Sequence, residues 1–61
     1  MKVVYILSNH GKNKNYVKQT FGNGATFTRD KENALKFDRE DAENMRKQLM
    51  QTIGNAYIEE K

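Results

Sequence analysis

The stretch VVYILS, residues 3–8, decides the fold of this 61-residue chain. Its β-branched and aromatic residues favour a strand. Val3, Tyr5 and Leu7 would face one side of that strand, and the two apolar residues between them would face the other. A run that is apolar on both faces is typical of a central strand with cover on each side. We therefore expect this segment to lie in the middle of a sheet.

The next two segments predict a loop and a β-hairpin. The polar run NHGKNKN, residues 9–15, is expected to be a loop, and YVKQTFGNGATFT, residues 16–28, has strand-forming residues on both sides of a glycine-rich turn. A two-residue turn at Asn23-Gly24 would send Phe21 and Phe27 to opposite faces. A three-residue turn, with Phe21 paired to Ala25, gathers the apolar side chains on one face. We expect the three-residue turn, with Gly24 in the left-handed conformation. The apolar face would carry Val17, Phe21, Ala25 and Phe27, and the outer face Tyr16, Lys18, Thr20, Thr26 and Thr28.

A single helical turn is expected in TRDKENALKF, residues 28–37. The side-chain oxygen of Thr28 or of Asp30 can accept from the first free backbone N–H groups of such a turn. Ala34 and Phe37 would then point into the core.

The main helix is expected to begin after Asp38, which would cap its first turn, and to end before Gly54. Its apolar residues recur at helical spacing and form one stripe. A short strand over residues 55–60 would follow. The residues of the stripe are Ala42, Met45, Leu49 and Ile53.

The element order β-β-β-α-β predicts one α+β domain over residues 1–61. We expect a small antiparallel-rich sheet of three to four strands with one main helix packed on one face. Only 36% of the residues are apolar, so the chain cannot fill a larger core.

The composition argues against an enzyme. With no cysteine and one histidine, thiol chemistry, Cys/His metal sites and paired-histidine catalysis have no residues to use. We expect no catalytic residues, no cofactor and no metal. The longest apolar run, Val3 to Leu7, is too short for a membrane helix or a signal peptide. We expect no membrane contact and a cytoplasmic location.

Charge is unevenly distributed along the chain. Residues 1–29 carry five basic and no acidic residues, a balance of +5, whereas residues 30–61 carry six basic and eight acidic residues, a balance of −2. This pattern predicts a basic sheet-and-hairpin half and a weakly acidic helical half.

All but one of the candidate contact residues lie in the basic half. An exposed Tyr16 on a basic hairpin could contact a partner protein, or could stack on a base beside a phosphate backbone. Arg46 and Met50 on one flank of the helix have a typical interface composition, although Arg46 could instead turn toward Glu43. The predicted partner-binding residues are Lys12, Lys14, Tyr16, Lys18, Thr26 and Arg46.

The whole pattern resembles small uncharacterised proteins encoded by bacteriophages and prophages of Gram-positive bacteria. Turn glycines and core positions over nearly the whole chain carry the resemblance, so it implies a fold and a class of function but no catalytic residue. The matching residues are Tyr5, Ile6, Gly11, Tyr16, Val17, Gly24, Phe27, Thr28, Asp30, Ala34, Phe37, Asp41, Ala42, Gly54, Tyr57 and Ile58.

The resemblance implies a protein that binds a bacterial host or defence protein and blocks or redirects it. Nucleic-acid binding by the basic half is the alternative. A sheet edge could also add a strand from a partner or pair with a second copy as a homodimer.

Overall fold

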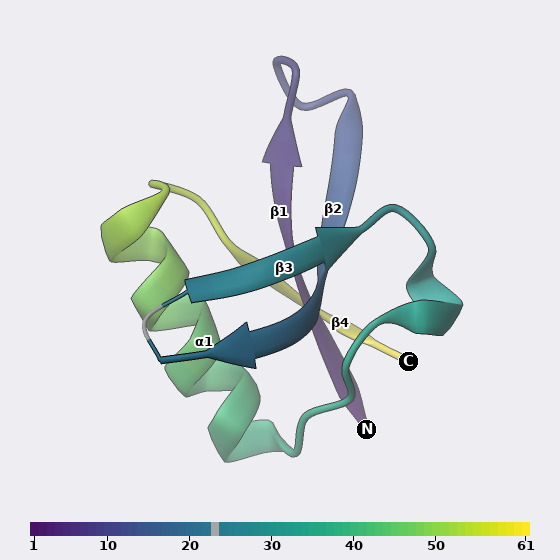
Figure 1. Ribbon diagram of the computed structural model, residues 1–61, viewed down its shortest axis with the longest axis vertical. Coiled ribbons are helices and arrows are strands. Elements are labelled where there is room, and N and C mark those ends of the chain that lie inside the picture. Colours follow the sequence, from purple (N-terminus) through teal and green to yellow (C-terminus); the bar gives the residue numbers. More distant parts are fainter. Residues whose placement is uncertain (23) are drawn as a thin grey trace.

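The computed structural model describes residues 1–22 and 24–61. Within these residues, four strands form one antiparallel sheet in the order β3-β2-β1-β4 (Figure 1). With one main helix, this confirms the expected α+β class. The elements are β1 (Lys2–Ser8), β2 (Asn13–Phe21), β3 (Gly24–Thr28), the 3-10 helix η1 (Lys31–Asn33), α1 (Arg39–Thr52) and β4 (Tyr57–Glu60).

Strand β1 lies between β2 and β4 and is covered on both faces, as the sequence predicts. Val3 and Val4 point to opposite faces and both are completely buried. Val4 belongs to the cluster packed under α1, whereas Val3 belongs to a second cluster on the other face. The molecule therefore has apolar contacts on both sides of its central strand.

The loop after β1 is shorter than expected. β2 begins at Asn13, which pairs with Ser8. Residues 9–12 of the polar run therefore form a tight turn, and residues 13–15 belong to the strand. Asn9, His10 and Gly11 all have positive φ, at 53°, 58° and 85°. Three consecutive left-handed residues reverse the chain within four residues, which is why β1 and β2 form a hairpin.

The turn between β2 and β3 also differs from both expected alternatives. Phe21 pairs directly with Gly24, and the left-handed residue described by the structure is Gly22, with φ of 55°. Gly24 is extended within β3 and lies under the Phe21 ring; a Cβ atom there would come 2.9 Å from a ring carbon. Asn23, which the predicted turn includes, lies outside the described residues.

A register shift in β2 reverses the predicted faces of the hairpin tip. Val17 pairs with Phe27 and Gln19 pairs with Thr26, so Lys18 is an extra residue with no counterpart. Such a bulge changes the alternation of side chains beyond it. Phe21, expected in the core, is 61% exposed, and Thr20, expected outside, faces α1. The bulge also bends β2, and Figure 1 shows the β2–β3 hairpin crossing in front of α1.

The helix α1 begins and ends as predicted. The Asp38 carboxylate accepts from the Asp41 N–H at 2.8 Å, and Gly54 follows the last turn with φ of 103°. Ala42, Met45 and Leu49 are buried against the sheet, but Ile53 is 46% exposed. The buried stripe is therefore one residue shorter than the sequence indicates.

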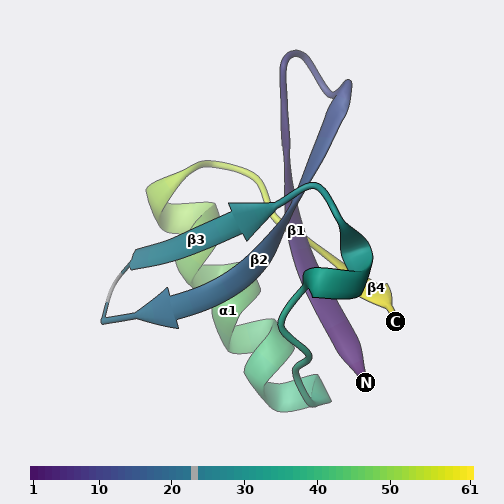
Figure 2. The ribbon, with the colours of Figure 1, turned by 45° about the vertical axis from the view of Figure 1, so that its right-hand side comes forward.

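The segment after β3 covers the face of the sheet opposite α1. Asp30 caps η1 by accepting from the Glu32 N–H, and Thr28 accepts from the Asp30 N–H, so both predicted capping residues take part. Ala34 is buried on this face against Val3 and Tyr16. Figure 2 shows η1 and α1 on opposite sides of β1. The face opposite α1 is therefore covered over part of its area, although the sequence predicts a helix on one face only.

Candidate interaction surface

The sheet carries a row of tyrosines on the face opposite α1. Tyr5 on β1 pairs with Tyr16 on β2 and with Tyr57 on β4. The ring centroids are 5.5 Å apart for Tyr5 and Tyr16, which are tilted, and 5.3 Å apart for Tyr5 and Tyr57, which are stacked. We call this surface the tyrosine face. Its residues are Tyr5, Leu7, Lys14, Tyr16, Tyr57 and Glu59.

Glu59 on β4 connects this face to β2 and to η1. Its carboxylate accepts from Lys14 Nζ at 2.9 Å, from Lys31 Nζ at 3.1 Å and from the Tyr16 hydroxyl at 3.2 Å. The hydrogen bonds from the two lysines are the main reason that the pKa of Glu59 falls to about 2. Because one carboxylate joins three separate segments, the tyrosine face is held in a fixed arrangement.

Lys14 contributes to the surface in two ways. Its hydrogen bond to Glu59 raises the Lys14 pKa, so the ammonium group stays charged. The same ammonium lies 4.7 Å from the centroid of the Tyr5 ring, within the range of a cation–π contact. The ring and the charge are thus presented together.

The exposed tyrosine is Tyr57, and the buried one is Tyr16. Tyr57 is 43% exposed, whereas Tyr16 is only 6% exposed because Ala34 packs against it. Burial and the hydrogen bond to Glu59 raise the pKa of the Tyr16 phenol. The expectation of an exposed Tyr16 available for stacking is wrong. Tyr57, with the half-buried Tyr5 beside it, presents the aromatic surface instead.

The charge polarity of the sequence is reduced in the fold. The acidic strand β4 pairs with β1, so Glu60 forms ion pairs with Lys2 and with the N-terminal amine. Glu59 likewise pairs with Lys14 from the basic half of the sequence. Two of the five basic residues that precede residue 30 are therefore matched by carboxylates from the last strand.

The other predicted contact residues are dispersed. Lys12 is exposed in the β1–β2 turn, and Lys18 and Thr26 are exposed on the β2–β3 hairpin. Arg46 lies on α1, and its Nε donates to Glu43 at 2.8 Å. That pairing was the alternative expected for Arg46, and it places the residue away from the tyrosine face. Of the predicted set, the structure brings together only Lys14 and Tyr16 on that face.

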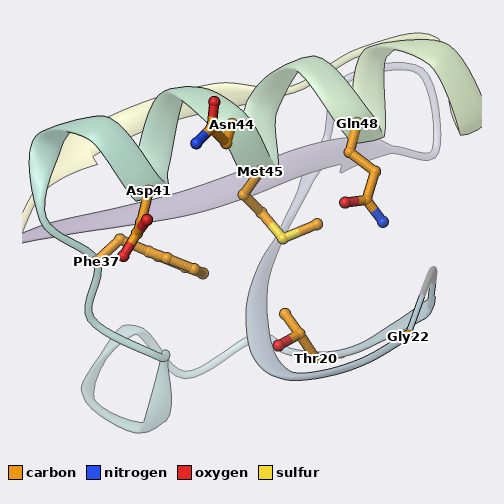
Figure 3. A pocket seen from close by; sticks show the side chains of 7 residues that line it. All are labelled: Thr20, Gly22, Phe37, Asp41, Asn44, Met45 and Gln48. Carbon is orange, nitrogen blue, oxygen red and sulfur yellow. The ribbon is translucent and has the colours of Figure 1, made fainter.

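A shallow groove lies between the β2–β3 hairpin and α1 (Figure 3). Its volume is about 320 Å³, and hydroxyl, carboxylate and amide groups surround one methionine and one phenylalanine side chain. Open, mostly polar surroundings of this kind exclude little water, so the groove gives no basis for assigning a small-molecule ligand. Its residues are Thr20, Gly22, Phe37, Asp41, Asn44, Met45 and Gln48.

Tyr5, Tyr57 and Glu59 are site residues that the sequence pattern does not predict. The alternation of side chains in β1 does place Tyr5 on the same face as Val3 and Leu7, so the face on which Tyr5 lies is predictable. The missing part was the pairing of β4 with β1, a contact between residues more than fifty positions apart. No local pattern specifies which strand the last segment joins.

Comparison of the chain with protein-family models, curated proteins and solved structures finds no match. The part of the chain that the structure describes contains no helix with the length and apolarity needed to cross a membrane. Over the same residues, no three His, Cys, Asp or Glu side chains are grouped closely enough to hold a metal ion.

Proposed function

We propose that this chain is a non-enzymatic binding protein that contacts a partner protein through its tyrosine face. The observation that carries the proposal is the stacked pair Tyr57 and Tyr5, which is accessible at Tyr57 and carries the Glu59-bound Lys14 against the Tyr5 ring. Tyrosine supplies a large contact area with a polar end and few rotatable bonds, so little conformational entropy is lost on binding. A surface already fixed before contact lowers the cost of association further.

The arrangement of charge favours a protein partner over nucleic acid. Phosphate backbones are bound by unpaired lysines and arginines, whose counterion release drives association. On the tyrosine face, Glu59 accepts from both Lys14 and Lys31, which reduces the positive charge offered to a phosphate. A mixed aromatic and charged surface of this kind is suited to the polar, aromatic side chains of a protein interface.

The class of partner follows from the resemblance to small phage and prophage proteins. Compact proteins of that kind often act by binding a partner in fixed proportion, and on this basis we propose a bacterial host or defence protein as the partner and the cytoplasm as the place of contact. A typical interface of about 800 Å² per partner is roughly one fifth of the 4172 Å² surface of this chain. Occupation of the tyrosine face would therefore involve much of one side of the molecule.

Affinity capture with variants of the tyrosine face tests this proposal. Tagged wild-type chain is incubated with lysate of a Gram-positive bacterium, in parallel with Tyr57→Ala and with the control Phe21→Ala. Phe21 is a more exposed aromatic residue, at 61%, on a different part of the sheet. We expect a partner captured by wild type and by Phe21→Ala but lost with Tyr57→Ala. Capture that is equal for all three chains would refute the proposed site.

Nucleic-acid binding remains a second candidate because Lys14 lies against the stacked tyrosines, a combination that also suits single-stranded bases. Fluorescence anisotropy with labelled single-stranded DNA and RNA decides between the two. A phosphate-driven complex would form at low salt and weaken steeply as salt is raised. We expect no such binding.

A further inference from the structure

The outer edge of β4 offers unpaired backbone groups. β4 pairs only with β1 among the described residues, so its other side has no neighbouring strand. The Lys61 N–H donates to the Met1 carbonyl, so the backbone groups of Lys61 point toward β1. Because backbone groups alternate in direction along a strand, the odd-numbered residues of β4 also direct their N–H and C=O groups toward β1. The corresponding groups of Ile58 and Glu60 therefore point outward, where another strand could pair with them.

Helical geometry puts two exposed apolar side chains of α1 on the side of this edge. Asp41, Asn44 and Gln48 line the groove under the hairpin, so that flank of α1 faces β2 and β3 (Figure 3). At about 100° per residue, Met50 and Ile53 project from the opposite flank. In a sheet ordered β3-β2-β1-β4, the opposite flank is the β4 side. Met50 and Ile53 are 42% and 46% exposed.

We propose that the β4 edge binds a second copy of this chain, strand β4 against strand β4 in antiparallel orientation. A two-fold contact must be complementary to itself, and an apolar patch beside free backbone groups meets this condition. Met50 and Ile53 of each copy would be covered near the two-fold axis. They would lie next to the Ile58 side chains, which point from β4 toward the α1 side of the sheet. The charges beside the patch are internally matched, because Arg46 pairs with Glu43 and Glu60 pairs with Lys2.

Charge and backbone geometry select one register. Placing Glu59 opposite Glu59, or Glu60 opposite Glu60, would bring like charges face to face. Centring the pair on Tyr57 would set Glu60 against Gly54, whose φ of 103° takes it out of the extended strand. Centring it on Ile58 avoids both problems and uses the outward groups of Ile58 and Glu60. Two Ile58 side chains then meet at the axis on the α1 side of the sheet.

This pairing would extend the binding surface of the proposed function, on which this part of the inference rests. With Ile58 at the axis, Tyr57 of each copy lies diagonally across from Tyr57 of the other, at a spacing of about 7–8 Å that aromatic rings can bridge. The two tyrosine faces would form one continuous surface on a doubled sheet. The contact would also bury apolar area that a chain of this size cannot cover alone.

Sedimentation equilibrium of the wild-type chain, from micromolar to millimolar concentration, tests the dimer directly. We expect the average mass to rise from 7.1 kDa toward twice that value. Amide hydrogen exchange at Ile58 and Glu60 should slow over the same concentration range, while exchange at Tyr57 and Glu59, already bonded to β1, should not change. A chain that stays monomeric at millimolar concentration would overturn the proposal.

Substitution of the flanking residues locates the contact. The double variant Met50→Lys, Ile53→Lys should lose the dimer, because it places four positive charges at the axis, whereas Phe21→Lys should keep it. Circular dichroism verifies that both variants are folded. A dimer that survives the double substitution, with unchanged exchange at Ile58, would place the contact elsewhere and contradict the inference.

The two proposals can fail independently. The folded double variant is also used for the affinity capture that tests the tyrosine face. Partner capture with no dimer at any concentration would leave the proposed function intact and refute the dimer. A chain that dimerises but captures no partner would support the dimer and refute the proposed function.

Discussion

On one side of the sheet, Val4 and Val17 are completely buried against Ala42, Met45 and Leu49 of α1. On the other side, three tyrosines lie beside one carboxylate, Glu59, that accepts from two lysines and from the Tyr16 phenol. The α1 side is stabilised by apolar burial, which does not depend on pH or salt at ordinary values. The tyrosine face depends on charge and remains partly in contact with water. Val3 and Tyr16 are also buried on this second side, but the larger apolar cluster lies under α1, and the exposed part of the tyrosine face is available for contact.

The largest effect is expected on the α1 side. Leu49 is 4% exposed, and Leu49→Ala should lower the free energy of unfolding by about 3 kcal/mol, through lost burial and the cavity left behind. In a chain this small, that loss leaves much of the population unfolded. Urea unfolding followed by circular dichroism measures it. Leu49→Met conserves volume and should cost about 1 kcal/mol; equal losses for the two variants would contradict cavity formation as the cause.

A smaller effect is expected on the tyrosine face. Glu59→Gln removes the charge that Lys14 and Lys31 share, but the groups are partly in water, with side-chain exposures of 30% for Glu59 and 45% for Lys14. We expect a loss of about 1 kcal/mol at neutral pH, because a network of partly exposed pairs contributes little more than this. The control Glu40→Gln changes an exposed carboxylate near the start of α1 and should cost a few tenths of a kcal/mol. A loss for Glu59→Gln as large as that for Leu49→Ala would remove the distinction between the two faces.

The contribution of Glu59 should depend on pH. The pKa of Glu59 falls from an ordinary value of 4.5 to about 2 in the folded chain. Because the pKa is lower in the folded state, the stabilisation is fully present above pH 4.5 and is lost as pH falls toward 2. Acid unfolding curves of wild type and Glu59→Gln should converge over this interval. A difference that stays constant with pH would mean that Glu59 acts through its shape and not through its charge.

The smallest effect is expected at the hairpin tip, which belongs to neither packed face. Phe21→Ser should change the free energy of unfolding by less than about 0.5 kcal/mol, because the ring is 61% exposed beyond the bulge at Lys18. Phe27→Ser is the matched change at a ring that packs on the core, and should cost about 2 kcal/mol. Similar losses at both positions would indicate a hairpin without the bulge.

The elements of the fold also differ in how far the sequence predicts them. Helix and central strand follow from local patterns: the Asp38 cap, the Ala42 to Leu49 stripe, and apolar residues at both parities of β1. The bulge at Lys18 has no such signal, since nothing in the residue types distinguishes an extra residue from a paired one. That single insertion reversed the predicted positions of Thr20 and Phe21.

Only part of the candidate site is predictable, because the rest depends on contacts that no local pattern specifies. Lys14 was identified from local charge, but the residues that complete the tyrosine face come from opposite ends of the chain. Tyr57 and Glu59 acquire their roles only when β4 lies beside β1. Tyr16 was expected to be exposed because the cover over it, Ala34, follows from tertiary packing and not from the pattern of the hairpin.

The pairing of β4 with β1 has a consequence for how the chain reaches its fold during synthesis. Lys2 on β1 pairs with Glu60 on β4, so β1 finds this neighbour only after the long segment between the two strands has been synthesised. Contacts between distant residues are slow to form, because a long loop must close before they contribute. The β1–β2 hairpin can form while translation continues, but one edge of β1 stays open until Glu60 has left the ribosome. During that interval the nascent chain exposes a strand edge that a chaperone could occupy.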